Sequence, residues 1–235
     1  MKPILFYGVP EGCSFGSIVA LEWSKRPYLL SRVEMPETVT SDAYRRINPV
    51  AETPSLLTER GDIISESMAI LNHIGAGAID QGIAFRQGTK EFDRLNQMLA
   101  FLNTTFFNAY SPLWHALEHA DEGREKATLV AYGNGKVAKA HADLELLLGD
   151  RKWLSGDHPT LADAYFMGIA RWSDFHKTAN HSGYPGLNRL YQKLEADPAV
   201  QFVHAIEHQR PAKSTGGFAG HIDFEDALQL GREIA

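Results

Sequence analysis

The chain has 235 residues, of which 44% are hydrophobic, and its formal net charge is −6. This length and composition allow one or two substantial cores without stabilising cross-links. The negative charge, without a cluster of lysine and arginine, argues against nucleic acid or an anionic membrane as the main partner. One cysteine excludes an intramolecular disulfide. No apolar run could span a bilayer and the N-terminal run is too short for a signal peptide, so we expect a cytoplasmic protein.

The first third of the chain alternates strand-like and helix-like runs in the order β-α-β-α-β-β-α. We expect strands at Ile4–Tyr7, Leu29–Val33, Ser55–Leu57 and Asp62–Ile64, and helices at Phe15–Ser24, Asp42–Ile47 and Ser67–Ile74. Glycines then mark a linker over residues 78–88, and a helical period follows over residues 89–208. The pattern therefore predicts an α/β domain over residues 1–77 followed by an all-α domain.

The chemistry begins at Cys13, which stands between the first expected strand and the first expected helix. Unpaired N–H groups and the positive end of the helix dipole favour an anion there, and therefore a thiolate. The same field would stabilise the thiolate of a bound thiol, and the hydroxyl of Ser14 could donate to that sulfur. The alternative is that Cys13 is an inert small residue and that Ser14 only caps the helix.

Thr53-Pro54 opens the third expected strand. Proline cannot donate to a ladder, so it must begin the strand, and a cis peptide bond would turn the N–H and C=O of Thr53 toward a ligand. An extended peptide could then pair with Thr53. The alternative is an ordinary trans proline at the start of a strand.

Ser65-Glu66-Ser67 lies between the fourth expected strand and the next helix. The N–H and hydroxyl of Ser67 could hold a carboxylate, and Glu66 could accept from a nearby ammonium group. An α-amino acid head group carries both charges. The alternative is a simple serine cap with an acidic first turn.

These three segments resemble the cytosolic glutathione transferases, and the Gly12-Cys13-Ser14 turn is most similar to the bacterial beta class. A fourth match is Gly156–Asp163, a capping box in which Thr160 and Asp163 satisfy each other's backbone N–H groups. The resemblance covers residues 1–208 and implies a thioredoxin-like domain followed by an all-helical domain, which is the glutathione transferase fold.

The resemblance also implies the activity and the site. It assigns glutathione binding, as co-substrate and without a metal, to Thr53, Pro54, Glu66 and Ser67, and it places Cys13 or Ser14 beside the glutathione sulfur. The implied enzyme is a homodimer that conjugates glutathione to a hydrophobic electrophile in detoxification. A glutathione-dependent thiol–disulfide reductase acting through Cys13 is a further possibility.

Two departures from the beta-class pattern permit a function other than catalysis. Phe107-Asn108 stands where beta-class relatives carry His-Lys, and Val33–Pro36 lacks the basic residue that relatives use after the second strand. The glycine carboxylate of glutathione therefore lacks an obvious counter-charge. These departures permit a non-catalytic binding or stress-regulatory protein with the same fold.

Aromatic residues recur at helical spacing in the second half. Phe106, Phe107, Tyr110 and Trp114 share one face of a helix and offer a surface for a hydrophobic electrophile. Core packing explains such a stripe more often than a pocket does, so we expect only one or two of these residues to contact substrate, with Phe107, Tyr110 and Trp114 as the candidates.

His115-Ala116-Leu117-Glu118-His119 fits the H-x-x-E-H pattern of inverted zinc peptidases. That function would require a third protein ligand, and the following charged residues indicate an exposed helix end. We therefore expect no metal site.

A C-terminal extension, residues 209–235, continues beyond the last helix of the resemblance. Its first part, Pro211–Gly217, reads as a turn, and the remainder places Phe224, Ala227, Leu228 and Ile234 on one face of a short helix. Because an exposed apolar stripe would be unusual, we expect the extension to fold back on its own body or on a partner subunit.

Overall fold

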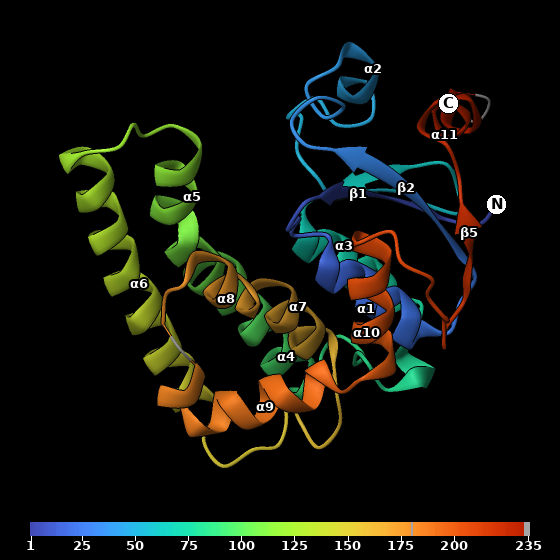
Figure 1. Cartoon of the computed structure of the whole chain (residues 1–235). Helices are drawn as coiled ribbons and strands as arrows, with labels where there is room; N and C mark the ends of the chain where they lie inside the picture. The colour runs from blue at the N-terminus through green and yellow to red at the C-terminus, as the bar shows by residue number, and fades with distance from the viewer. Residues whose placement is uncertain (180, 233–235) are drawn as a thin grey trace. The chain divides into compact units, whose positions relative to one another are not determined.

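The structure is a computed structural model that describes residues 1–179 and 181–232. The chain forms two compact units (Figure 1). Unit 1 comprises Met1–Arg86 and Ala196–Ala235, and unit 2 comprises Gln87–Glu195. Unit 1 is therefore assembled from both ends of the sequence.

Unit 1 is built on a five-stranded sheet with the strand order β4-β3-β1-β2-β5. The strands are β1 (Ile4–Val9), β2 (Tyr28–Glu34), β3 (Ser55–Leu57), β4 (Ile63–Ser65) and β5 (Phe218–His221). Strands β1 and β2 are parallel, whereas β3 pairs antiparallel with both β1 and β4. The first four strands form the expected thioredoxin-like mixed sheet. Strand β5 has no counterpart in the sequence-based prediction.

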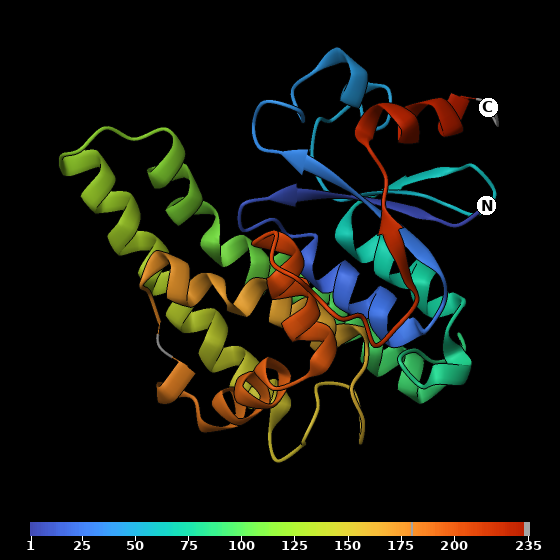
Figure 2. The same cartoon turned by 45° about the vertical axis from the view of Figure 1, so that its right-hand side comes forward.

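Helices cover both faces of this sheet (Figure 1). They are α1 (Phe15–Ser24), α2 (Asp42–Arg45), α3 (Ser67–Ala76), the short η1 (Ile79–Gln81), α10 (Pro198–Glu207) and α11 (Phe224–Arg232). Helices α1, α3 and α10 lie on one face, and α2 and α11 lie on the other (Figure 2). Side chains alternate along β1, so Ile4 and Phe6 contribute to the cluster beneath α2 and α11.

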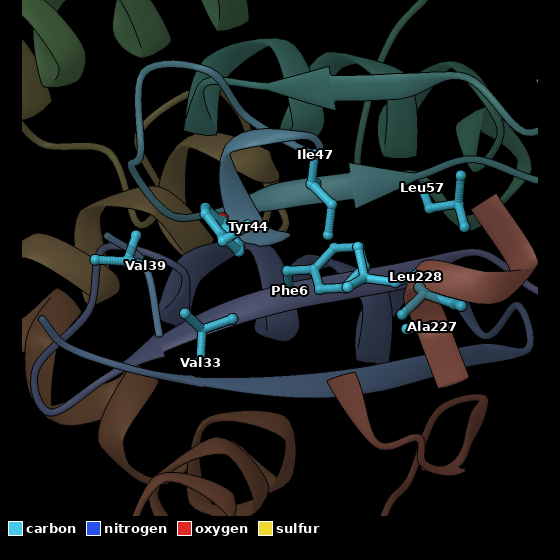
Figure 3. Close-up of a cluster of buried hydrophobic side chains, with 9 residues drawn as sticks. Phe6, Val33, Val39, Tyr44, Ile47, Leu57, Ala227 and Leu228 are labelled. Carbon is cyan, nitrogen blue, oxygen red and sulfur yellow. The ribbon is translucent and has the colours of Figure 1, made fainter. Parts of the chain in front are cut away.

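The extension folds back on its own body, which confirms that expectation. Strand β5 runs parallel to β2 and pairs Phe218 with Tyr28. In Figure 3, Ala227 and Leu228 of α11 lie beside Phe6, in a cluster of buried side chains. Ile234, also expected on the apolar face, lies outside the described residues.

A buried carboxylate anchors the start of the extension. Glu22 of α1 is 0% exposed and accepts hydrogen bonds from Thr215 N and Gly216 N, both at 2.8 Å, and from the hydroxyl of Ser214. The hydroxyl of Tyr28 donates to the same carboxylate at 2.7 Å. A Cβ atom on Gly217 would overlap the carbonyl of Arg26, so only glycine fits there. The extension is thus held by polar contacts before it enters the sheet.

Unit 2 is helical, as expected. Its elements are α4 (Lys90–Phe101), a π-helical turn η2 (Leu102–Phe107), η3 (Asn108–Tyr110), α5 (Ser111–Glu118), α6 (Arg124–Leu148), α7 (Leu161–Ala170), α8 (Trp172–His176), η4 (His181–Gly183) and α9 (Pro185–Glu195). Helix α10, which the sequence grouped with this half, belongs to unit 1. Across the described ranges, no helix is long and apolar enough to cross a membrane.

The capping box at the start of α7 is confirmed. The Asp163 carboxylate accepts from Thr160 N at 2.8 Å and also from Leu154 N at 2.9 Å. Burial raises the pKa of Asp163 to about 6 in spite of these hydrogen bonds. The box fixes the entry into α7, every residue of which is buried.

Candidate functional site

The chain turns sharply after β1, and two glycines make the turn possible. A Cβ atom on Gly12 would overlap the carbonyl oxygen of Gly8, and a Cβ atom on Gly8 would overlap the hydroxyl of Thr53. Both positions therefore need a residue without a side chain. The close approach brings the segment before α1 against the segment before β3.

Cys13 and Thr53 meet at this point. The Sγ atom of Cys13 donates to the carbonyl oxygen of Thr53 at 3.0 Å, joining residues that are 40 positions apart. Cys13 is partly exposed and precedes α1, which confirms its expected place beside a helix N-terminus. The thiol is therefore reachable from solvent and is held against a main-chain group of the Thr53-Pro54 segment.

The hydroxyl of Ser14 is directed toward β1. The residue stands at the N-cap of α1 but makes no side-chain cap; its hydroxyl oxygen instead accepts from Gly8 N at 3.0 Å. Only 1% of Ser14 is exposed. Of the two residues expected beside a bound sulfur, Cys13 is thus the accessible one.

The peptide bond between Thr53 and Pro54 is cis. The preceding loop is fixed at the carbonyl of Glu52, which accepts from the Tyr44 hydroxyl at 2.9 Å and from the Asn48 amide at 2.8 Å. Burial raises the pKa of Tyr44 to about 12, so the phenol stays protonated and can donate. Tyr44 and Asn48 position the loop, a role that their sequence neighbours do not reveal.

Glu66 and Ser67 form the junction between β4 and α3. Glu66 is exposed and has φ 71°, a conformation that side chains rarely adopt, and no side chain caps the helix that follows. Ser67, the first residue of α3, is 7% exposed. A strained non-glycine residue beside an uncapped helix start is typical of a site that receives a polar ligand.

The candidate aromatic residues of unit 2 divide into two kinds. Tyr110 is 0% exposed and its hydroxyl lies 2.6 Å from that of Ser173, so it belongs to the core. Phe107 and Trp114 are half-buried, and both contact Trp172 edge to face at 5.2 Å and 5.3 Å between ring centroids. These two can contact a ligand in this conformation, whereas Tyr110 cannot.

Helix α8 adds residues to the aromatic cluster that the sequence reasoning missed. Trp172 fills its centre, Phe175 stacks on Trp114 at 5.3 Å, and His176 lies 4.5 Å from Trp114 between ring centroids. Burial lowers the pKa of His176 to about 4, so the imidazole is neutral at pH 7. The spacing of these α8 residues, three and four apart, was a signal available in the sequence.

The H-x-x-E-H pattern gains no support as a metal site. His115 and His119 are exposed, with ring centroids 5.0 Å apart. Within the part of the chain that the structure describes, no group of three or more histidine, cysteine or acidic side chains could hold a metal ion.

Two protein-family descriptions match the sequence. "Glutathione S-transferase, N-terminal domain" matches residues 17–78, and "Glutathione S-transferase, C-terminal domain" matches residues 109–198. The "Glutathione S-transferase GST-4.5" of Xanthomonas campestris pv. campestris is 29% identical over 83% of this chain and 94% of its own.

Solved structures show the same similarity. A sphingomonad glutathione S-transferase complexed with glutathione is 25% identical, with a TM-score of 0.75 over 87% of this chain and 98% of its own. The bacterial beta class glutathione S-transferase of Sphingomonas chungbukensis is 24% identical, with a TM-score of 0.75 over the same shares, and supports the fold.

Proposed function

This chain belongs to the glutathione S-transferase family, and we propose that it binds glutathione in unit 1 and transfers it to a hydrophobic electrophile. The observation that carries the proposal is the 3.0 Å contact between the Cys13 thiol and the Thr53 carbonyl. It joins the thiol to the main-chain group that would pair with the peptide backbone of glutathione.

The site suits two neighbouring parts of the ligand, the γ-glutamyl head group and the cysteinyl residue. The N–H groups at the start of α3 and the hydroxyl of Ser67 would hold the α-carboxylate of the γ-glutamyl residue, and Glu66 would accept from its ammonium group. The main chain of Thr53 would pair with the cysteinyl residue. This arrangement would direct the glutathione sulfur toward Cys13.

Cys13 would then act on that sulfur. Its thiol would exchange the Thr53 carbonyl for the glutathione thiolate and stabilise the negative charge by donating a hydrogen bond. The thiolate would attack the electrophilic carbon, so that a carbon–sulfur bond forms and the leaving group departs with its electron pair. Ser14, whose oxygen is turned toward β1, would support the turn.

The accessibility of Cys13 favours a second candidate activity. Its thiolate could attack a mixed disulfide between glutathione and a substrate thiol, forming a disulfide between Cys13 and glutathione and releasing the substrate thiolate. A second glutathione would then attack this disulfide, releasing glutathione disulfide and regenerating Cys13. Such a protein would exchange disulfides as well as conjugate.

The remaining features of the proposal follow the family. We propose that Phe107 and Trp114 contact the electrophile, that residues 1–77 carry the glutathione site, and that two copies form a twofold homodimer in the cytoplasm. Light scattering at the single-chain mass of 26.1 kDa would contradict the dimer.

Calorimetric titration with glutathione tests the binding site. Ser67→Ala should weaken binding by about 1 to 3 kcal/mol, the scale of a charge-assisted hydrogen bond, and exposed Glu91→Ala should leave it unchanged. Turnover of chlorodinitrobenzene is the second measurement. Binding without turnover of that electrophile or of hydroxyethyl disulfide would instead support a non-catalytic, regulatory protein.

A further inference from the structure

A cavity of about 420 Å³ lies within unit 1, beside β2 and β5. Tyr7 and Arg32 of the central strands line one side, the C-terminal end of α10 lines another, and residues 221–224 of the extension line a third. Figure 2 shows β5 of the extension beside β2. Cys13, Thr53 and Ser67 are absent from the described lining, so this cavity is separate from the proposed glutathione site.

One arginine of the described lining makes no ion pair. Arg210 is exposed, and its guanidinium makes no hydrogen bond or ion pair within residues 1–179 and 181–232. Arg32, by contrast, is held in place, because its Nε donates to Glu34 at 2.6 Å and its Nη1 donates to the Glu207 carbonyl at 3.1 Å. Asp223 is the one acidic side chain in the described lining, but Glu34 pairs with Arg32 and, in addition to burial, both Glu34 and Glu207 lie near enough to Tyr7 to raise its pKa. The anion-binding character of the cavity therefore rests on Arg210.

Two neutral polar groups stand beside these arginines. The Tyr7 hydroxyl lies 3.4 Å from Nε2 of His221. Burial raises the pKa of Tyr7, and burial together with the charge of Arg32 lowers the pKa of His221. Both groups are therefore uncharged at pH 7, and each can hydrogen-bond a ligand oxygen without neutralising Arg210.

The opposite lining is apolar. Ile206 of α10 is buried, and Ile222 and Phe224 of the extension are half-buried. A ligand that fits both sides has an anionic head and an apolar body. The apolar side distinguishes such a ligand from a small inorganic anion.

We propose that this cavity binds a small organic carboxylate, with its carboxylate on Arg210 and its apolar body against Ile206, Ile222 and Phe224. Arginine suits this role because its planar guanidinium binds a carboxylate through two parallel hydrogen bonds. The residues contributed by the extension lie beyond both family matches, which end at residues 78 and 198. The extension therefore builds a second ligand site into unit 1.

Calorimetric titration of the full chain with benzoate tests the proposal. Arg210→Gln should weaken benzoate binding at least tenfold, and it should not disturb folding because the side chain is exposed and unpaired. Arg189→Gln is the matched control, since Arg189 is also exposed but lies in unit 2, and its benzoate affinity should equal that of the parent. Equal affinity in Arg210→Gln and the parent would overturn the proposal.

Two further titrations locate the ligand. Benzoate binding should persist in the presence of S-hexylglutathione, and displacement would overturn the proposal by placing benzoate in the glutathione site. Inorganic phosphate should bind at least tenfold more weakly than benzoate, and equal affinity would overturn the assignment of an organic ligand. A protein that binds benzoate but not S-hexylglutathione would refute the proposed function and leave this second site standing.

Discussion

Replacing Glu22 with glutamine should loosen the C-terminal extension while preserving side-chain volume. The carboxylate lies in α1, and two of its donors, Thr215 N and Gly216 N, both bond the same oxygen at 2.8 Å. Its other donors are the hydroxyls of Tyr28 and Ser214. Hydroxyls can rotate to accept from the new amide, but main-chain N–H groups cannot.

The size of the effect follows from these contacts. If the oxygen of the new side-chain amide faces the two main-chain N–H groups, both hydrogen bonds persist but lose their charge. A hydrogen bond to a charged group contributes about 1.5 to 3 kcal/mol and a neutral one about 0.5 to 1.5 kcal/mol, so the loss is about 1 kcal/mol for each bond. The total of about 2 kcal/mol corresponds to a Tm lower by about 4 to 8 °C for a chain of this size.

Thermal unfolding and amide exchange measure this prediction together. The amide of Ile222, which donates to the Leu30 carbonyl at 2.9 Å, reports whether β5 and its continuation remain docked on β2. Its protection should fall in Glu22→Gln, and amides of α6 in unit 2 should keep theirs. Glu37→Gln, at an exposed position of unit 1, is the control and should change neither quantity.

An unchanged Tm together with unchanged protection at Ile222 would refute the reasoning. The buried carboxylate would then contribute nothing beyond packing. Gly217→Ala provides an independent check, because its Cβ atom would overlap the Arg26 carbonyl and should undock the extension whatever the role of Glu22.

Three other predictions concern the site and unit 2. Incubation with glutathione disulfide should add one glutathione mass to the folded protein, reversibly by reductant, and Cys13→Ala should abolish the adduct; a mass spectrum without an adduct would exclude the reductase activity. Tyr44→Phe removes the donor to the Glu52 carbonyl and should cost about 1 to 2 kcal/mol in denaturant titration and weaken glutathione binding. Burial raises the pKa of Asp163 from 3.8 to about 6. Between these two pH values the folded state holds a proton that the unfolded state has lost, so the free energy of unfolding falls as the pH rises. Asp163→Asn should remove this pH dependence, which amounts to up to about 1.4 kcal/mol per pH unit. Urea titrations in which the free energy of unfolding changes equally with pH in the variant and the parent would refute the prediction.

The features that could be predicted from the sequence depend on neighbours along the chain. The turn before α1 needs glycine at residue 12, and the box at the start of α7 needs Thr160 and Asp163 three positions apart. Both signals lie within a few residues. The same holds for the first four strands, whose apolar runs are bounded by turn residues.

Strand β5 could not be predicted in the same way. Phe218–His221 contains alanine and a glycine with φ 123°, neither of which favours a strand. Its pairing with β2 therefore depends on the tertiary contacts of the extension. The orientation of the Ser14 side chain could not be predicted either, because only the fold shows that its hydroxyl accepts a hydrogen bond from Gly8 N.

The anchoring of the extension has a consequence for the order of folding during synthesis. Glu22 and Thr215 are 193 positions apart, so the outer edge of β2 stays unpaired until almost the whole chain has left the ribosome. Contacts of such long range close slowly, and an unpaired strand edge is prone to join other chains in the interval. Ribosome-bound chains that end before residue 214 should accordingly aggregate more readily than full-length chains.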